Sequence, residues 1–479
     1  MREQVGNEGK AEGKGPAGSR GLAVLAVAIL LASLGVSIAT VALPTLAQAF
    51  TTPMASVQWV VLAYLLSVTV AIVAGGRMGD LFGHRRVLLV GLAVFAAASA
   101  GAAVAPTLGV LIAARAAQGI GGAILMALPM SIARETVPTE RTGAAMGLLG
   151  SMSAIGTALG PSVGGALIAW QGWRASFVLL ALLGLGVLVL AARELPLAGP
   201  KQPQRRPRLD LAGMLVLAVS LTVYALAMTG AVAWMHGGVL LAAAAVGGVL
   251  FVLVERRAAA PLVHLPVLAS RRIAASLAMN LLVATGMMAT LVVGPFYLTF
   301  VLGLNEALVG LVMAAGPAIS ALSGVPAGRV TDRFGAPRIL VFGLVEATVG
   351  FLCLALLPDL LGVAGYVVAL ALLTPGFQCF LAANNTATMV AAREDQRGMV
   401  SGLLGLSRNL GFMTGASAMG AVFAAAAGTQ DVAHATAEAV SRGFSTTFLV
   451  AAGLMVVALI AALAGRRAGA PRTVRQEVG

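Results

Sequence analysis

The chain has 479 residues, of which 59% are hydrophobic and only 10% are charged. Soluble domains carry roughly 25% charged residues, so this composition excludes a soluble globular fold and indicates that lipid is the solvent. The net charge of +13 raises nucleic-acid binding as an alternative, which the placement of the charges argues against below. Cys353 and Cys379 both lie inside apolar runs and fit neither a disulfide framework nor a metal site.

Long apolar runs predict an all-α membrane fold, because a spanning helix needs about 20 residues and these runs are too continuous for barrel strands. The first run is longer than the roughly 7–15 apolar residues of a signal peptide, so we expect an uncleaved first span. We predict fourteen spans, over residues 22–47, 56–76, 87–105, 107–133, 142–170, 175–193, 210–230, 238–255, 273–302, 306–327, 338–357, 363–391, 397–427 and 443–464.

The basic residues alternate between the two sides of the predicted membrane. Of the 31 lysines and arginines, all but four lie in the two tails or in the even-numbered connections between spans. The exceptions are Arg115, Arg174, Arg408 and Arg442. By the positive-inside rule both termini are cytoplasmic. Charges placed in this way set membrane topology, and they argue against a nucleic-acid partner.

A charged motif occurs twice, each time between two apolar runs. GRMGDLFGHRR at Gly76–Arg86 recurs as GRVTDRFGAPR at Gly328–Arg338. We expect each copy to be a short loop, in which glycines allow a tight turn and close helix approach and the Asp pairs with Arg or caps helix amides. The residues concerned are Gly76, Asp80, Gly83, Arg85 and Arg86 in the first copy and Asp332 in the second, which has one basic residue fewer.

The repetition predicts two related bundles of six helices each. The distance between the two copies exceeds what six helices need, and the surplus fits a pair of extra helices, 210–230 and 238–255. The predicted division is a cytoplasmic tail (1–20), an N-terminal bundle (21–194), a linker with two inserted helices (195–260), a C-terminal bundle (261–466) and a second cytoplasmic tail (467–479).

Two further motifs lie inside predicted spans. Arg115 opens the segment RAAQGIGG in the fourth span. A buried membrane Arg costs about 2.5–3.5 kcal/mol, so it must face a polar cavity, a partner or backbone carbonyls. The fifth span contains GTALGPSVGG, in which proline removes a backbone donor and glycines let a neighbouring helix approach closely. Its key positions are Gly156, Gly160, Pro161, Gly164 and Gly165.

Taken together, these motifs resemble motifs A, B and C of the major facilitator superfamily, and within it the 14-spanning drug/proton antiporters. The resemblance implies a non-enzymatic, proton-coupled multidrug exporter that works by alternating access. It also implies a monomer in the bacterial cytoplasmic (inner) membrane, with protons and lipophilic small molecules as partners and with no cofactor or metal. The residues that it implies for coupling or gating are Asp80, Arg85, Arg86, Arg115, Asp332, Glu346 and Arg408.

The first span departs from this family. Gly35 and Thr40 stand where these antiporters have Asp and Asn. Glu346 is then the one acid near mid-depth, either as a proton carrier or as a protonated or paired side chain packed against a neighbour. Because Arg115 and Arg408 make the interior more positive than negative, we expect neutral or anionic solutes to be preferred over dications.

The remaining polar and aromatic residues of the spans are candidates for the substrate cavity, although helix packing explains them equally well. They are Gln118, Asn280, Phe296, Tyr297, Gln378, Asn384 and Asn385. Adjacent helical residues point about 100° apart, so we expect one of Asn384 and Asn385 to face substrate. No lysine lies in a GxxxxGK[ST] loop, which favours a proton gradient over ATP. A dedicated metabolite or toxin exporter and a transporter-like membrane sensor remain alternatives.

Overall fold

The protein is helical throughout the part that its computed structural model describes, residues 17–136, 142–195, 210–229, 237–258, 269–392, 397–429 and 431–467. The predicted tails lie almost entirely outside these ranges, as do residues 196–209 of the predicted linker. The elements are α1 (Ala17–Val41), α2 (Leu43–Ala49), α3 (Met54–Val57), α4 (Trp59–Phe82), α5 (His84–Ala103), α6 (Leu108–Thr136), α7 (Thr142–Gln171), α8 (Trp173–Glu194), α9 (Leu211–Thr229), α10 (Gly237–Arg257), α12 (Arg271–Phe300), α13 (Glu306–Phe334), α14 (Ala336–Ala391), α15 (Arg397–Thr414), the π-helical turn η3 (Gly415–Met419), α16 (Gly420–Ala427), the short helix η4 (Val432–His434) and α17 (Ala437–Arg467).

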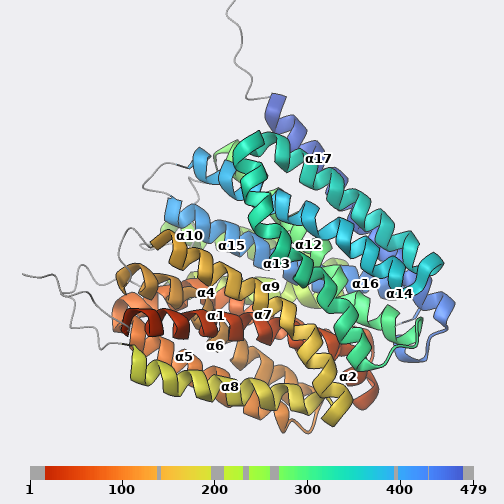
Figure 1. Cartoon of the computed structure of the whole chain (residues 1–479), viewed down its shortest axis with the longest axis horizontal. Coiled ribbons are helices and arrows are strands. Elements are labelled where there is room, and N and C mark those ends of the chain that lie inside the picture. Colours follow the sequence, from red (N-terminus) through yellow and green to blue (C-terminus); the bar gives the residue numbers. More distant parts are fainter. Residues whose placement is uncertain are drawn as a thin grey trace, which may run out of the picture.

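Eleven of the described helices are long and apolar enough to cross a membrane, and the long helices run roughly parallel (Figure 1). The element α14 has 56 residues, far more than a bilayer needs, and its backbone breaks the helix at Gly362, with φ 58° and ψ −133°. A Cβ on Gly350 would lie 2.5 Å from the Cα of Leu373. The two limbs of α14 therefore pack against each other, and the structure replaces the connection predicted between 357 and 363 by one glycine.

The repeated motif is mostly helix, which corrects the expectation of a loop. Residues 76–82 complete α4, and His84 already begins α5. Only Gly83 leaves the helix, with φ 90°, a value that glycine adopts without strain. Gly335 does the same between α13 and α14, with φ 85°. A Cβ on Gly76 would meet nothing within 4 Å, so this glycine does not serve close helix approach.

The fifth predicted span, α7, lies at the centre of the helix contacts. On one side it packs along α1, and on the other along α13 of the second half. A Cβ on Gly164 would lie 2.8 Å from Val41, and Gly156 and Gly160 likewise face α1. Gly165 turns to the other half, where its Cβ would lie 2.8 Å from the Cα of Gly310. The predicted close-approach role of these glycines matches their contacts.

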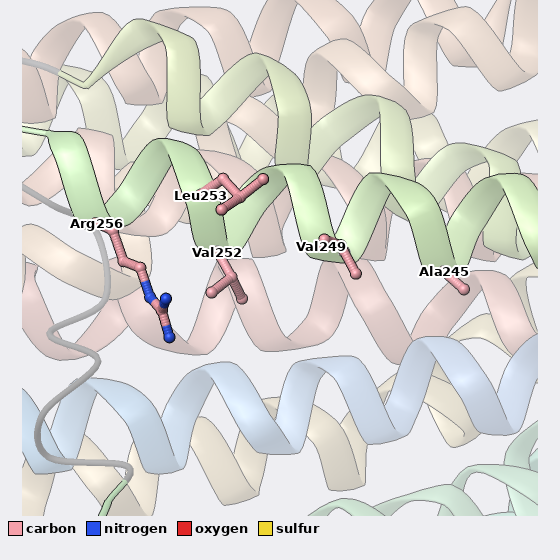
Figure 2. A pocket seen from close by; sticks show the side chains of 6 residues that line it. Ala245, Val249, Val252, Leu253 and Arg256 are labelled. Atoms are coloured by element: carbon pink, nitrogen blue, oxygen red, sulfur yellow. The ribbon is translucent and has the colours of Figure 1, made fainter.

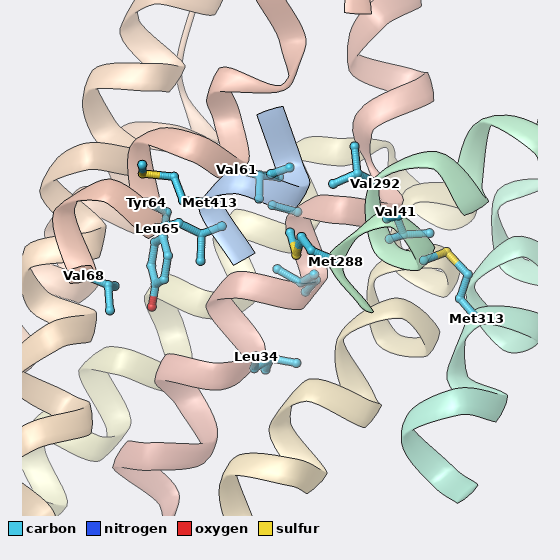
Figure 3. Packing of buried hydrophobic residues seen from close by; sticks show 14 of the residues in the cluster. Leu34, Val41, Val61, Tyr64, Leu65, Val68, Met288, Val292, Met313 and Met413 are labelled. Carbon is cyan, nitrogen blue, oxygen red and sulfur yellow. The ribbon is translucent and has the colours of Figure 1, made fainter. Parts of the chain in front are cut away.

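Besides the packing of α7 along α13 and of α4 on α15, the two halves meet at the end of the molecule where α2, α3 and η4 lie, which we call the α2 end. There α2 contacts α12 and η4, α3 contacts α16, and Gln58 lies against Gly420. A continuous apolar cluster extends from this end between the halves. It includes Val41, Val61, Met288, Met313 and Met413 (Figure 3). In the described residues, the two halves are thus joined at the α2 end by apolar side chains and close backbone contacts.

The two inserted helices form a hairpin beside the seam between the halves. Helix α9 contacts α4 of the first half and α15, η3 and α16 of the second. Within the hairpin, a Cβ on Gly247 of α10 would lie 2.9 Å from the Cβ of Ser220 on α9. Phe251 of α10 packs against a small apolar cluster that contains Ile273 and Leu403. The hairpin is therefore a closely packed pair that touches both halves.

The contact between α7 and α13 gives a direct test of the fold. Gly165→Ala places a methyl group against the Gly310 backbone and the carbonyl oxygen of Glu306. We expect this overpacking to lower the free energy of unfolding by about 1–3 kcal/mol. Gly186→Ala on α8 is the matched control, because a Cβ there meets nothing within 4 Å, and we expect a change within about 1 kcal/mol. Thermal unfolding of both purified variants measures the difference, and equal midpoints would contradict the α7–α13 contact.

Candidate functional site

Arg115 on α6 is fully buried, with 0% of its surface exposed. Its Nε donates to the carbonyl oxygen of Val60 on α4 at 2.8 Å, and its Nη1 donates to the carbonyl oxygen of Gly35 on α1 at 2.9 Å. Nη1 also donates to Oε1 of Gln118. Backbone dipoles and an amide therefore hold this cation, as the structural interpretation of the sequence anticipates, and no carboxylate is among its hydrogen-bond partners in the described residues.

A shell of side chains fixes this arginine in place. Its guanidinium lies 4.4 Å from the centre of the Tyr64 ring, a cation–π distance. The Tyr64 hydroxyl donates to the carbonyl oxygen of Ala32 at 2.9 Å, and Gln118 donates to the Ser99 hydroxyl at 2.6 Å. Gln118 thus supports Arg115 and does not line an open cavity in this conformation. No sequence signal pointed to Ser99, because its partners lie on other helices.

Position 35 belongs to this shell. A Cβ on Gly35 would lie 3.1 Å from the Phe95 ring and 3.5 Å from the Tyr64 hydroxyl. The Nη2 atom of Arg115 is buried and has no hydrogen-bond partner among the residues that the structure describes. The residue that replaces the family's Asp therefore contributes its carbonyl oxygen to Arg115, whereas the arginine keeps one unused donor.

Arg408 on α15 differs from Arg115 in both its exposure and its hydrogen bonding. Its side chain is exposed, and it has no hydrogen-bond or ion-pair partner in the described part of the chain. Its neighbours are packed: Ser407 donates to the carbonyl oxygen of Leu277 on α12 at 2.6 Å, and Asn409 is buried. Contacts of Ser407 and Asn409 thus hold α15 in place, while the guanidinium of Arg408 between them stays exposed.

Glu346 lies on the first limb of α14, half-buried against the second limb. A Cβ on Gly376 would lie 2.9 Å from the Cβ of Glu346. Among the described residues, this carboxyl group has no hydrogen-bond or ion-pair partner. Its place between the two limbs of α14 fits a side chain packed against a neighbour. Glu346 shares its helix with neither Arg115, which is on α6, nor Arg408, which is on α15.

The predicted amides divide into packing contacts and one exposed residue. Asn280 donates to the carbonyl oxygen of Leu404 at 2.9 Å, and Gln378 donates to the Ser320 hydroxyl. Asn384 is fully buried and accepts from Ser276 of α12 at 2.8 Å. Asn385 is exposed and lines a shallow depression of about 450 Å³ together with Thr386, Met389 and Val390. Of the adjacent pair, Asn385 is the one open to a ligand.

The two aromatic candidates are packed inside the second half in this conformation, which is one of the two alternatives that the sequence left open. The Phe296 ring lies 6.1 Å from that of Phe423 on α16. Tyr297 stacks on Phe444 of α17 at 4.1 Å, and its hydroxyl donates to Asp359 at 2.8 Å. Ser441 donates to the same Asp359 oxygen at 2.7 Å. This carboxylate joins α12, α14 and α17, a role that its position in a predicted connection did not reveal.

The basic residues of the repeated motif behave differently in its two copies. Arg85 donates to the carbonyl oxygens of Leu195 and Ala192, at 2.8 and 2.6 Å, and so binds the last turn of α8, where a cation is favoured. Arg86 is exposed. Asp332 is also exposed, with no hydrogen bond or ion pair in the described residues. The side chain of Asp80 lies outside the described part of the structure, so its pairing stays a prediction.

Comparison with known proteins identifies the family. Residues 25–416 and 275–478 match the sequence profile of the Major Facilitator Superfamily. The chain belongs to this superfamily. It is 31% identical over 411 residues to the multidrug efflux pump LfrA of Mycolicibacterium smegmatis, which covers 84% of this chain and 80% of that protein. It is 28% identical over 406 residues to the riboflavin transporter RibZ of Clostridioides difficile, which covers 84% and 88%.

Solved structures agree with this membership at the level of the fold. A bacterial homologue of the human lysosomal transporter Spinster, in an inward-facing and unoccupied conformation, matches with a TM-score of 0.72. The match covers 95% of this chain and 98% of that one, at 17% sequence identity. The superfamily chain described here therefore has the fold of a membrane transporter.

The two intramembrane arginines are expected to respond differently to the same substitution. Arg115→Gln removes the charge-assisted hydrogen bonds to Gly35 and Val60, each worth about 1.5–3 kcal/mol, and we expect a large fall in the thermal unfolding midpoint. Arg408→Gln removes no hydrogen bond, so we expect stability to change by about 0.5 kcal/mol or less. If Arg408→Gln destabilises the purified protein as much as Arg115→Gln does, the assignment of a structural and an available arginine is wrong.

Proposed function

We propose that this member of the superfamily is a proton-coupled exporter of small lipophilic molecules, working by alternating access. In this proposal the protein lies in the cytoplasmic membrane of a bacterial cell. It crosses that membrane fourteen times and has both termini in the cytoplasm. The α2 end is then the external end, and Gly83 and Gly335 lie at the cytoplasmic side. One observation carries the proposal. Helix α7 contacts both α1 and α13 through the glycines of the GTALGPSVGG segment, which resembles motif C of the drug/proton antiporters.

Alternating access requires that the contacts at the α2 end can part. At Gly165 and Gly310 the two backbones approach each other closely, because neither residue has a side chain. Helices joined in this way can separate as rigid units, without a change of side-chain rotamers at that point. Rocking of the two halves would open the α2 end and close the cytoplasmic end. Because Gly83 and Gly335 each interrupt the helix at one residue only, the helices on either side would stay intact during this movement.

The charges favour neutral or anionic substrates over dications. Arg115 has no carboxylate among its described hydrogen-bond partners, and Arg408 is exposed and unpaired. Gly35 supplies no acid of its own. Arg408, the exposed one of the two, attracts or tolerates electron-rich and anionic groups and repels a doubly positive solute. Export of one specific neutral or anionic metabolite or toxin is therefore the second candidate, and similarity to a riboflavin transporter supports it alongside the similarity to multidrug pumps.

Flux through proteoliposomes tests the proposal. With the purified chain in vesicles and an imposed proton gradient, we expect movement of riboflavin or of the anionic dye fluorescein to rise several-fold over a protonophore-treated sample. A gradient of about 100 mV supplies roughly 2.3 kcal/mol per charge, enough for such a change. Flux that ignores the gradient would contradict proton coupling. The absence of flux for a broad panel of solutes would favour a transporter-like sensor.

Restoring the acid at position 35 tests the charge argument. In Gly35→Asp, the new carboxylate belongs to the residue whose carbonyl oxygen accepts from Arg115, and it adds a negative charge to the first span. We expect export of the cation ethidium, relative to fluorescein, to rise by about tenfold, since pairing of opposite charges is worth at least 1 kcal/mol away from bulk water. The matched control is Gly35→Asn, which has nearly the same shape and no charge. Equal ratios in the two variants would show that charge at this position does not select substrate.

A further inference from the structure

Helix α10 is the most exposed of the described spanning helices. Only 11% of its apolar window, Gly238–Arg257, is buried inside the protein. Val246 and Val249 expose 59% and 61% of their surfaces. An apolar helix of this kind is stable only where lipid or another apolar surface covers it.

One face of α10 carries a shallow, open depression. A groove of about 450 Å³ is lined by Ala245, Gly248, Val249, Val252, Leu253 and Arg256. These positions recur every three or four residues and so form one stripe along the helix. Figure 2 shows Val249, Val252 and Arg256 projecting from the same side of α10. The stripe is about 16 Å long at 1.5 Å per residue, which is close to half of the roughly 30 Å hydrocarbon core.

The groove has a charge at one end only. Arg256 is exposed and has no hydrogen-bond or ion-pair partner among the described residues. The acid next to it, Glu255, is only 3% exposed and points to the other side of the helix, where it lies near Gly213 of α9. The carboxylate therefore does not occupy the groove beside Arg256. An apolar channel one leaflet long that ends in an unpaired cation is complementary to an acyl chain that ends in a phosphate.

We propose that this face of α10 binds one anionic phospholipid, with an acyl chain along Ala245–Leu253 and the headgroup phosphate at Arg256. Gly248 leaves the space in the middle of the groove that the chain fills. Basic residues at the ends of membrane helices attract anionic headgroups, and here the attraction is coupled to a fitted apolar surface. The site is independent of the transport reaction proposed above, because it needs neither a substrate nor a proton gradient.

Lipid retention tests the site with matched variants. The full chain is reconstituted in vesicles of equimolar palmitoyl-oleoyl phosphatidylglycerol and phosphatidylcholine, extracted in mild detergent and examined by native mass spectrometry. We expect the wild type to retain one phosphatidylglycerol in preference to phosphatidylcholine. Arg256→Gln should reduce that retention about fivefold, the effect of one cation at a membrane surface. Arg257→Gln is the control, because Arg257 is also exposed in the last turn but does not line the groove.

A second variant separates the apolar contact from the charge. Gly248→Trp fills the groove and keeps Arg256, and we expect it to lose the lipid as well; nothing lies within 4 Å of a Cβ at this position, so folding should be unaffected. Equal loss in Arg256→Gln and Arg257→Gln would overturn the proposal in favour of diffuse surface charge. Equal retention of both lipids by the wild type would also overturn it. A third outcome would overturn it too. If the wild type is a dimer and Gly248→Trp keeps the lipid but becomes monomeric, a second copy of the chain occupies the groove.

Discussion

Absence of water inside a bilayer is the constraint on which this structure depends. A polar group buried there must find its partner within the protein. The described chain meets this demand first by being helical throughout, so that backbone groups bond within each segment. It then brings helices together where glycine removes the side chain, as between α1, α7 and α13. Close backbone approach and buried polar contacts are consequences of the same constraint, and the candidate site is built from both.

Arg115 and Arg408 show two ways of keeping a cation in such an environment. Arg115 is surrounded by carbonyl oxygens of two neighbouring helices, an amide and an aromatic face. Moving α1 or α4 relative to α6 would break charge-assisted bonds, so this arginine holds the first half together as a rigid unit. Arg408 is exposed and makes no such bonds in the described structure. The cation that is bonded within the fold and the cation that is exposed are therefore carried by different helices.

The sequence predicted the helical segments well, because long apolar runs bounded by charges leave few alternatives. It also predicted the role of the α7 glycines, since five small or helix-breaking residues at close spacing indicate a backbone contact. It did not predict that the charged motif is helix interrupted only at Gly83, because glycine and charge suggest a loop when φ is unknown. The sequence could not predict which residues bind Arg115 for another reason. The acceptors are backbone carbonyl oxygens, which every residue has. Similarly, Phe296 and Tyr297 could equally line a cavity or fill a core, and their contacts with Phe423 and Phe444 on distant helices decided between the two.

The inserted hairpin has a different relation to each half, and this difference bears on how the halves can move. Its helices pack closely on each other at Ser220 and Gly247, so they move as a pair. Phe251 attaches α10 to the apolar cluster of α12, α14 and α15, and α9 contacts α15, η3 and α16. In the first half, α9 contacts α4 alone among the pairs with extensive contact in the described structure. Since α9 contacts both halves and Phe251 adds a contact of α10 with the second half, we expect the hairpin to follow the second half. Rocking of the proposed kind would then slide α4 along α9, so the hairpin would continue to cover the seam in both states.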